Sequence, residues 1–227
     1  TQGVRDVGSN GAMIFIHKNK VPKNKKVTYA NMVCNFQPTK QEQYRVRLTI
    51  GGDVLDFFAD SSPPAVSLIE TKLILNSTIS DSHKGAQFFT IDIKDFPLQS
   101  YLNDPEYLRI HQKYFFDDIR KKYNIDDLVV KDGYVYCELK RGLYGLKQAA
   151  RLARDQLVKH LGKYGYSPCR YAPNIWKQET LRTKFCLCVD DFGVKCFSET
   201  DANHLINALK KAYDITIDRS GTRFCGL

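Results

Sequence analysis

The sequence predicts an α+β protein whose second half forms a split β-α-β unit, a four-stranded antiparallel sheet with its helices on one face. From residue 85 onward, the patterns follow the order strand, helix, strand, turn, strand, helix, strand. The first 60 residues instead have the pattern of short strands joined by turns. Of the 227 residues, 43% are hydrophobic and 26% charged, which is typical of a globular protein and excludes a disordered tail or a fibre.

In the first half, the apolar run 13–16 predicts a strand, and a loop rich in Lys, Pro and Asn follows it. Residues 44–50 alternate polar with apolar side chains and end at the glycine pair 51–52, which predicts a strand entering a turn. Two prolines at 63–64 then precede apolar residues at helical spacing, so we expect a helix over 65–75.

The second half begins with an apolar strand over 88–93 that ends on a carboxylate. An Asp-Gly pair at 132–133 predicts a hairpin. The remaining expected elements are a helix over 146–164, strands at 185–189 and 194–197 joined by a tight connection at 190–193, a capped helix over 201–213 and a last strand from residue 215.

The net charge of +9 is concentrated near the start of the chain. Residues 1–50 carry nine basic and two acidic side chains, a local excess of 9 − 2 = +7. Such a surface attracts a polyanion, although a solubilising face explains it equally well. The seven cysteines form no pair of metal-binding Cys-x-x-Cys clusters, and we expect them to be reduced packing residues.

Three aspartates are expected to meet at one edge of the second-half sheet. In the split β-α-β topology, the third strand lies between the first two and runs antiparallel to the first. The end of the first strand, with Asp92, therefore comes beside the turn with Asp190 and Asp191. Carboxylates this close repel one another, and a divalent cation such as Mg²⁺ or Mn²⁺ removes that penalty. Because aspartate is common in turns, the pair at 190–191 alone also fits a plain hairpin.

Three motifs in this order resemble the reverse transcriptase of copia-type LTR retrotransposons. They are Asp92-Ile93-Lys94 at the end of a strand, the run LYGLKQA at 143–149 opening a helix, and Val-Asp-Asp at 189–191 on a hairpin. The similarity extends through nearly the whole chain. It implies a right-hand polymerase fold with a fingers-like basic region at 1–84, a palm at 85–98 and 141–227, and a returning fingers segment at 99–140.

The resemblance implies a role for each matched residue. Asp92, Asp190 and Asp191 would be the catalytic triad that binds two Mg²⁺ or Mn²⁺ ions, with Asp191 the less direct ligand. The backbone carbonyl of Ile93 would contact the ion on the nucleotide side. The implied nucleotide contacts are Arg47, with Arg45 as second choice, Pro97, Tyr144, Gly145 and Lys147. The residues themselves leave open a surface role for Arg47 and a core role for Tyr144.

Pro97 stands where relatives of this family place an aromatic ring that excludes the ribose 2′-hydroxyl. Proline is smaller, fixes φ and lacks an N–H, so we expect impaired selection of deoxynucleotides or an inactive copy. The chain begins at Thr1 and ends at Leu227, so we expect a fragment of a retrotransposon polyprotein without thumb or RNase H regions.

The expected partners are an RNA or DNA template-primer, deoxynucleoside triphosphates and the rest of the polyprotein, including integrase and RNase H. The expected location is a cytoplasmic particle or the nucleus. No apolar run is long enough to span a bilayer, so no membrane partner is expected. Two alternatives stay open: a catalytically decayed copy, and a non-catalytic RNA-binding module on the same sheet topology, with exposed aromatics such as those near Tyr134 stacking on bases.

Overall fold

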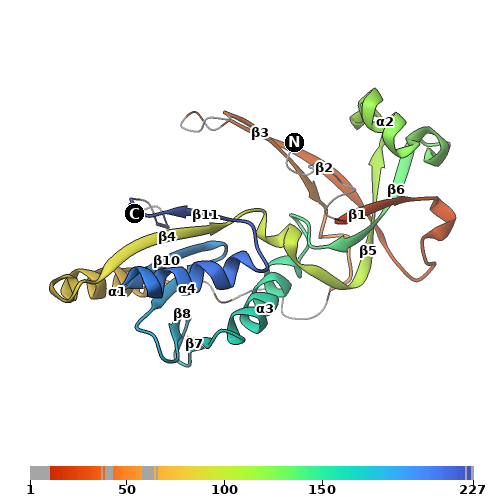
Figure 1. Ribbon diagram of the computed structural model, residues 1–227. Helices are drawn as coiled ribbons and strands as arrows, with labels where there is room; N and C mark the ends of the chain where they lie inside the picture. Colours follow the sequence, from red (N-terminus) through yellow and green to blue (C-terminus); the bar gives the residue numbers. More distant parts are fainter. Residues whose placement is uncertain are drawn as a thin grey trace. The chain divides into compact units, whose positions relative to one another are not determined.

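The structure is a computed structural model that describes residues 11–36, 38, 43–57, 64, 66–222, 224 and 225. Pro63 and Ala65, at the start of the expected helix over 65–75, lie outside the described residues. The chain forms two compact units that each combine two stretches of sequence: unit 1 holds Thr1–Ser61 and Pro97–Leu152, and unit 2 holds Ser62–Phe96 and Ala153–Leu227. Helices and antiparallel strands in both units make this a mixed α+β protein, as predicted (Figure 1).

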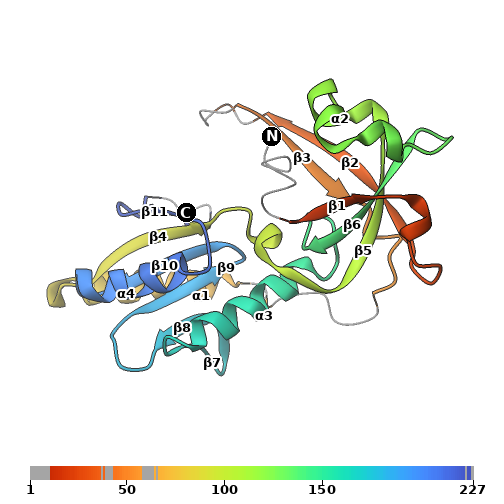
Figure 2. The ribbon, with the colours of Figure 1, turned by 45° about the vertical axis from the view of Figure 1, so that its right-hand side comes forward.

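Unit 1 is built on a five-stranded sheet in the order β1-β6-β5-β2-β3 (Figure 2). Neighbouring strands are antiparallel except for the parallel pair β2 and β5. Apolar side chains from this sheet, such as Leu108, Cys137 and Leu139, form a buried core. The strands are β1 (Met13–Ile16), β2 (Val27–Phe36), β3 (Tyr44–Ile50), β5 (Tyr101–His111) and β6 (Tyr134–Arg141), and the α-helix is α2 (Asp117–Tyr123).

Unit 2 is built on a six-stranded antiparallel sheet in the order β11-β4-β10-β9-β8-β7. Its strands are β4 (Gln87–Ile93), β7 (Tyr166–Cys169), β8 (Ala172–Gln178), β9 (Lys184–Cys188), β10 (Asp191–Cys196) and β11 (Ile215–Asp218), and its helices are α1 (Leu68–Ser80), α3 (Ala149–Gly162) and α4 (Glu199–Lys210). The first residues of α3 belong to unit 1 by the contacts they make.

Four of these strands have the predicted topology. In chain order they are β4, β9, β10 and β11, and β10 lies between β4 and β9 while β11 flanks β4. The expectation that the third strand would run antiparallel to the first is confirmed by the pairing of β10 with β4. The sheet has six strands rather than four, however, because the hairpin of β7 and β8 extends it beyond β9.

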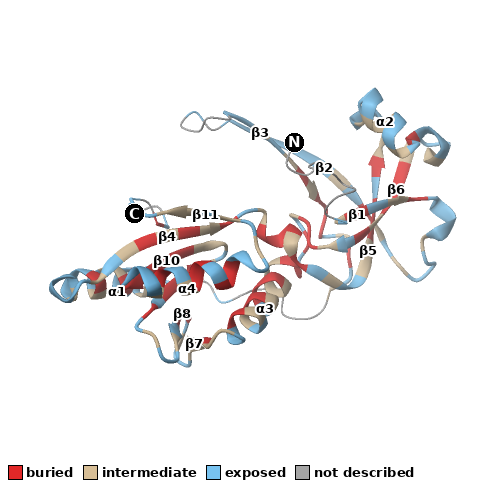
Figure 3. Ribbon diagram, in the orientation of Figure 1, coloured by how far each residue is buried: buried red, intermediate tan, exposed pale blue. Residues whose placement is uncertain are grey.

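The prediction that the helices of the split β-α-β unit lie on one face of its sheet is confirmed for α3 and α4, but α1, which was expected to belong to the fingers-like region, covers the other face. On one face, α3 and α4 pack over Ile91, Leu187 and Val194. On the other face, Ile74 of α1 packs with Cys186. Side chains alternate along a strand, so both faces of these strands are apolar and each needs its own cover. Figure 3 shows the resulting buried stretches along β4 and β10.

The helix boundaries differ from the predicted ones because capping side chains and a preceding turn set where the helices begin. The helix expected at 65–75 runs over Leu68–Ser80, since Ser67 and Glu70 form a capping box. The helix expected at 146–164 begins only at Ala149, because residues 143–148 form turns with an N–H···O bond from Leu146 to Leu143 of 3.1 Å. The helix expected at 201–213 runs over Glu199–Lys210, capped by the Ser198 hydroxyl.

Two turn predictions need correction. The connection between β9 and β10 is not at 190–193 but is a two-residue turn of Val189 and Asp190, because Cys188 already pairs with Asp191. The turn at Asp132-Gly133 is present, but the residues before it are not a strand. Strand β6, which follows this turn, instead pairs with β1 and β5. The Tyr134 strand therefore belongs to the unit 1 sheet and not to the split β-α-β sheet.

Candidate metal centre and nucleotide contacts

Asp92, Asp190 and Asp191 come together at one end of the unit 2 sheet. The register of β10 against β4 sets Asp191 directly opposite Asp92. The backbone N–H of Ile93 donates to the carbonyl oxygen of Asp190 at 3.0 Å, which ties the hairpin turn to the end of β4. One ligand atom from each of the three carboxylates lies within 4.8 Å of the others. The predicted meeting of the three aspartates is therefore present.

The Val189-Asp190 turn holds this end of the sheet in an unusual backbone conformation. Val189 has a φ of +58°, a region that β-branched residues rarely adopt. Val189 is 56% exposed, so packing of its side chain does not explain the choice of residue. The two-residue hairpin imposes this φ, because tight hairpins match the twist of their strands only with a positive φ in the turn. Strain of this kind is found where a turn must aim particular side chains.

The donor set of the three aspartates fits a hard divalent cation. All three ligands are carboxylates, and none of them is buried, so an ion can reach them from solvent. Three like charges this close repel one another, and a cation would relieve that repulsion. All-oxygen ligation suits Mg²⁺ or Mn²⁺ rather than zinc. Ile93 lies at the same strand end but is fully buried, so its backbone carbonyl is not presented to solvent.

The predicted nucleotide contacts lie in unit 1, and several of them come together there. The guanidinium carbon of Arg47 on β3 lies 5.2 Å from the ring centre of Tyr144. The backbone N–H of Ile50, at the end of the same strand, donates to the carbonyl of Tyr144 at 2.9 Å. Arg45 lies two residues before Arg47 and so on the same face of β3. Lys147 follows in the adjoining turn and is exposed.

Gly145 and Pro97 have packing roles in the structure. Gly145 has a φ of +99°, and a Cβ there would overlap the carbonyl oxygen of Ile50 and lie 3.0 Å from its nitrogen. Only glycine permits this close approach of two backbone segments. Pro97 is buried in a 3₁₀ turn over Phe96–Gln99, and its carbonyl accepts from the N–H of Ser100 at 3.1 Å.

Sequence reasoning missed an ion pair on the face of the sheet covered by α1. Lys195 is only 4% exposed, and its Nζ lies 2.6 Å from Asp81 Oδ2 and 2.7 Å from both oxygens of Ser77. The hydrogen bond from Lys195 lowers the pKa of Asp81 below its ordinary value of 3.8, and Lys84 adds to this effect. The single lysine within the apolar strand 194–197 was the feature of the sequence that could have indicated this ion pair.

Comparison with models of known protein families finds no match for this chain. Among the residues that the structure describes, no helix combines the length and apolar character needed to cross a membrane. All seven cysteines carry free thiols. Burial raises the pKa of the Cys186 thiol to about 12.

Proposed function

We propose that the chain is a fragment of an RNA-directed DNA polymerase, the reverse transcriptase of a copia-type retrotransposon. In this proposal, the palm at 85–98 and 141–227 corresponds to most of unit 2, and the fingers regions at 1–84 and 99–140 correspond to most of unit 1. The single observation that carries it is the meeting of Asp92 with Asp190 and Asp191, which come from segments almost a hundred residues apart. The motif at 143–149 adds the resemblance that a cluster of carboxylates alone would lack.

The three carboxylates would hold two Mg²⁺ or Mn²⁺ ions, with Asp92 and Asp190 as the main ligands and Asp191 as the less direct one. The backbone carbonyl of Ile93 would contact the ion on the nucleotide side. When bound, two such ions activate the primer 3′-hydroxyl and stabilise the leaving oxygen of the triphosphate. The protein contributes by positioning: the register of β10 against β4 and the strained turn at Val189 keep the ligands in place before any substrate arrives.

In unit 1, Arg47 would hold the triphosphate, with Arg45 as the second choice. A guanidinium binds phosphate through two parallel hydrogen bonds. The aromatic ring of Tyr144 would keep the guanidinium of Arg47 oriented. Lys147 and the backbone of Gly145 would contact the nucleotide and template. The proposed substrates are a template-primer and deoxynucleoside triphosphates, and the proposed setting is a polyprotein acting in a cytoplasmic particle or the nucleus.

Metal binding by the full chain is the first test. We expect saturable Mn²⁺ binding in a calorimetric titration, and a loss of affinity of about tenfold or more in Asp190→Asn, because a charged ligand is removed. The matched control is Asp155→Asn. Asp155 is an exposed residue of α3, and α3 packs on the face of the sheet opposite to the one that α1 covers. Equal binding by the two variants would exclude the metal centre.

Primer extension is the second test. The full chain is given a primed RNA template, Mn²⁺ and either deoxy- or ribonucleotides. Extension that Asp190→Asn abolishes and Asp155→Asn retains would support the polymerase. With Pro97 at the position described above, we expect poor discrimination between the two nucleotide classes, and a strong preference for deoxynucleotides would contradict that. Metal binding without extension would identify a decayed copy.

One observation favours the alternative of an RNA-binding module. A pocket in unit 1, with a volume of about 310 Å³, is lined mainly by aromatic and basic side chains and by no carboxylate. In it, the guanidinium of Arg109 lies 4.7 Å from the ring centre of Tyr134. Aromatic rings beside cations suit stacking of single-stranded bases. RNA binding that Tyr134→Ala weakens, without metal binding or extension, would support this function instead.

A further inference from the structure

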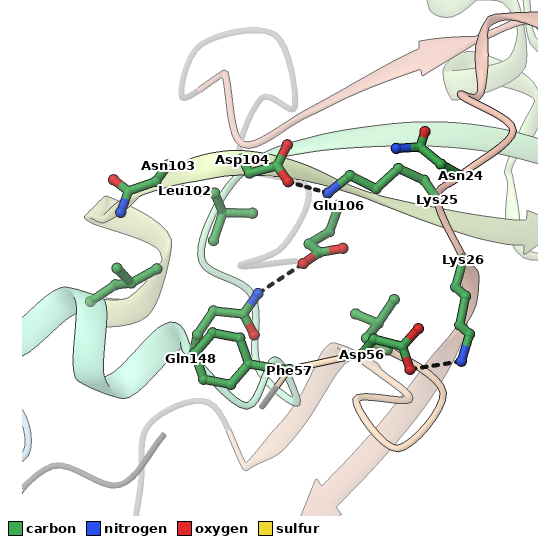
Figure 4. A pocket seen from close by; sticks show the side chains of 12 residues that line it. Asn24, Lys25, Lys26, Asp56, Phe57, Leu102, Asn103, Asp104, Glu106 and Gln148 are labelled. Carbon is green, nitrogen blue, oxygen red and sulfur yellow. Dashed lines mark hydrogen bonds and ion pairs between the residues drawn. The ribbon is translucent and has the colours of Figure 1, made fainter. Parts of the chain in front are cut away.

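A larger pocket in unit 1, with a volume of about 440 Å³, has an unusual combination of charges and an unsatisfied acceptor. Figure 4 shows how its side chains lie: the amide of Gln148 meets the carboxylate of Glu106 between two lysine–aspartate pairs. Lys25 pairs with Asp104, and Lys26 Nζ lies 2.7 Å from Asp56 Oδ1. None of the functions proposed above uses this pocket.

The ionisable groups of the pocket carry an excess of negative charge. Three carboxylates face two ammonium groups, and each lysine already pairs with an aspartate. Glu106 is the carboxylate left over, and although the charge of Lys25 acts on it, its pKa is raised because burial disfavours the charged form. A cation that entered the pocket would offset this unfavourable burial.

Gln148 adds a specific demand for a hydrogen-bond donor. Its side chain is only 6% exposed, and its Nε2 donates to Glu106 Oε1 at 3.0 Å. Within the described chain, no donor reaches its Oε1, which is shielded from solvent. A buried acceptor without a partner is costly, so a ligand that supplies the missing N–H would gain affinity. The terminal torsion of glutamine is soft, so this oxygen can turn toward a ligand whose own N–H replaces Nε2 as the donor to Glu106.

We propose that this pocket binds an amidinium or guanidinium group, such as the side chain of an arginine on a protein partner. One N–H would donate to Glu106 and another to Gln148 Oε1, while the positive charge offsets the excess carboxylate. A planar cation with several fixed donors meets both demands, whereas an ammonium is a point charge. Leu55, Phe57 and Leu102 provide apolar walls for the faces of such a group. The carboxylates disfavour a phosphate-bearing ligand.

The probe for this proposal is benzamidine, titrated calorimetrically into the full chain without metal or nucleic acid. We expect saturable binding, and about tenfold or more loss of affinity in Glu106→Gln, since a hydrogen bond to a charged group is lost. The matched control is Glu138→Gln, a half-exposed glutamate of β6 that does not line the pocket, which should bind like the unmodified chain. Circular dichroism verifies that each variant is folded.

Other ligands separate the sources of the bound group. N-acetyl-arginine amide should bind more tightly than N-acetyl-lysine amide, and benzamidine more tightly than benzylamine. A preference for guanosine over benzamidine would mean that a neutral base edge is recognised, and would overturn the proposal. Equal affinity of Glu106→Gln and Glu138→Gln for benzamidine would overturn it as well. Because these titrations involve neither Asp92 nor a polymerase substrate, their failure would leave the proposed polymerase function untouched.

Discussion

The close approach of two backbone segments at Gly145 makes a quantitative prediction about unit 1. In Gly145→Ala, the new methyl group meets the carbonyl of Ile50, and the residue must keep a φ of +99°. A side chain at positive φ costs about 1–2 kcal/mol. Overlap with a backbone that cannot yield adds about 1–3 kcal/mol. We therefore expect Gly145→Ala to lower the stability of unit 1 by about 3 kcal/mol, or roughly 12 °C in melting temperature.

The control for this prediction is Gly11→Ala. Gly11 also has a positive φ, +56°, but a Cβ there meets nothing within 4 Å, so only the conformational cost of about 1 kcal/mol remains. Hydrogen exchange is the assay that locates the effect. The N–H of Ile50, which donates to Tyr144, should lose protection in Gly145→Ala, while amides of β10 in unit 2 keep theirs. A loss of stability no larger than that of Gly11→Ala would refute the reasoning.

Three further predictions concern charge and strain. Since Lys195 lowers the pKa of Asp81, this carboxylate stabilises the fold at pH values above its ordinary pKa of 3.8. The unmodified chain should therefore be more stable than Asp81→Asn at pH 7, and this difference in stability should disappear as acid protonates Asp81. The effect of Glu106 has the opposite sign, because burial raises its pKa. Glu106→Gln should therefore be as stable as the unmodified chain near pH 4 and more stable than it at pH 7. A variant less stable than the unmodified chain at pH 7 would contradict this. Val189→Gly should raise the stability of unit 2 by up to about 1 kcal/mol, measured by urea unfolding with the fluorescence of the single tryptophan.

The strands around the aspartates were predictable because their signals are local. Apolar runs at 88–93 and 185–189 locate β4 and β9, and period-2 alternation locates β3 over Tyr44–Ile50. The chain order of these elements then limits the topology to a few arrangements. Strands β2 and β5 were missed because polar residues and a proline interrupt them, and only pairing with neighbouring strands defines them.

The sequence by itself determined the α+β class, the order of the four strands that share the split β-α-β topology and the meeting of Asp92 with Asp190 and Asp191, because apolar periodicity and strand order are written in the chain. Only the tertiary structure decided that α1 covers the second face, that the buried Lys195 pairs with Asp81, and that Glu106 and Gln148 line one pocket. These features join residues distant in sequence whose individual patterns are ordinary, and their energies arise from burial, which no local pattern records.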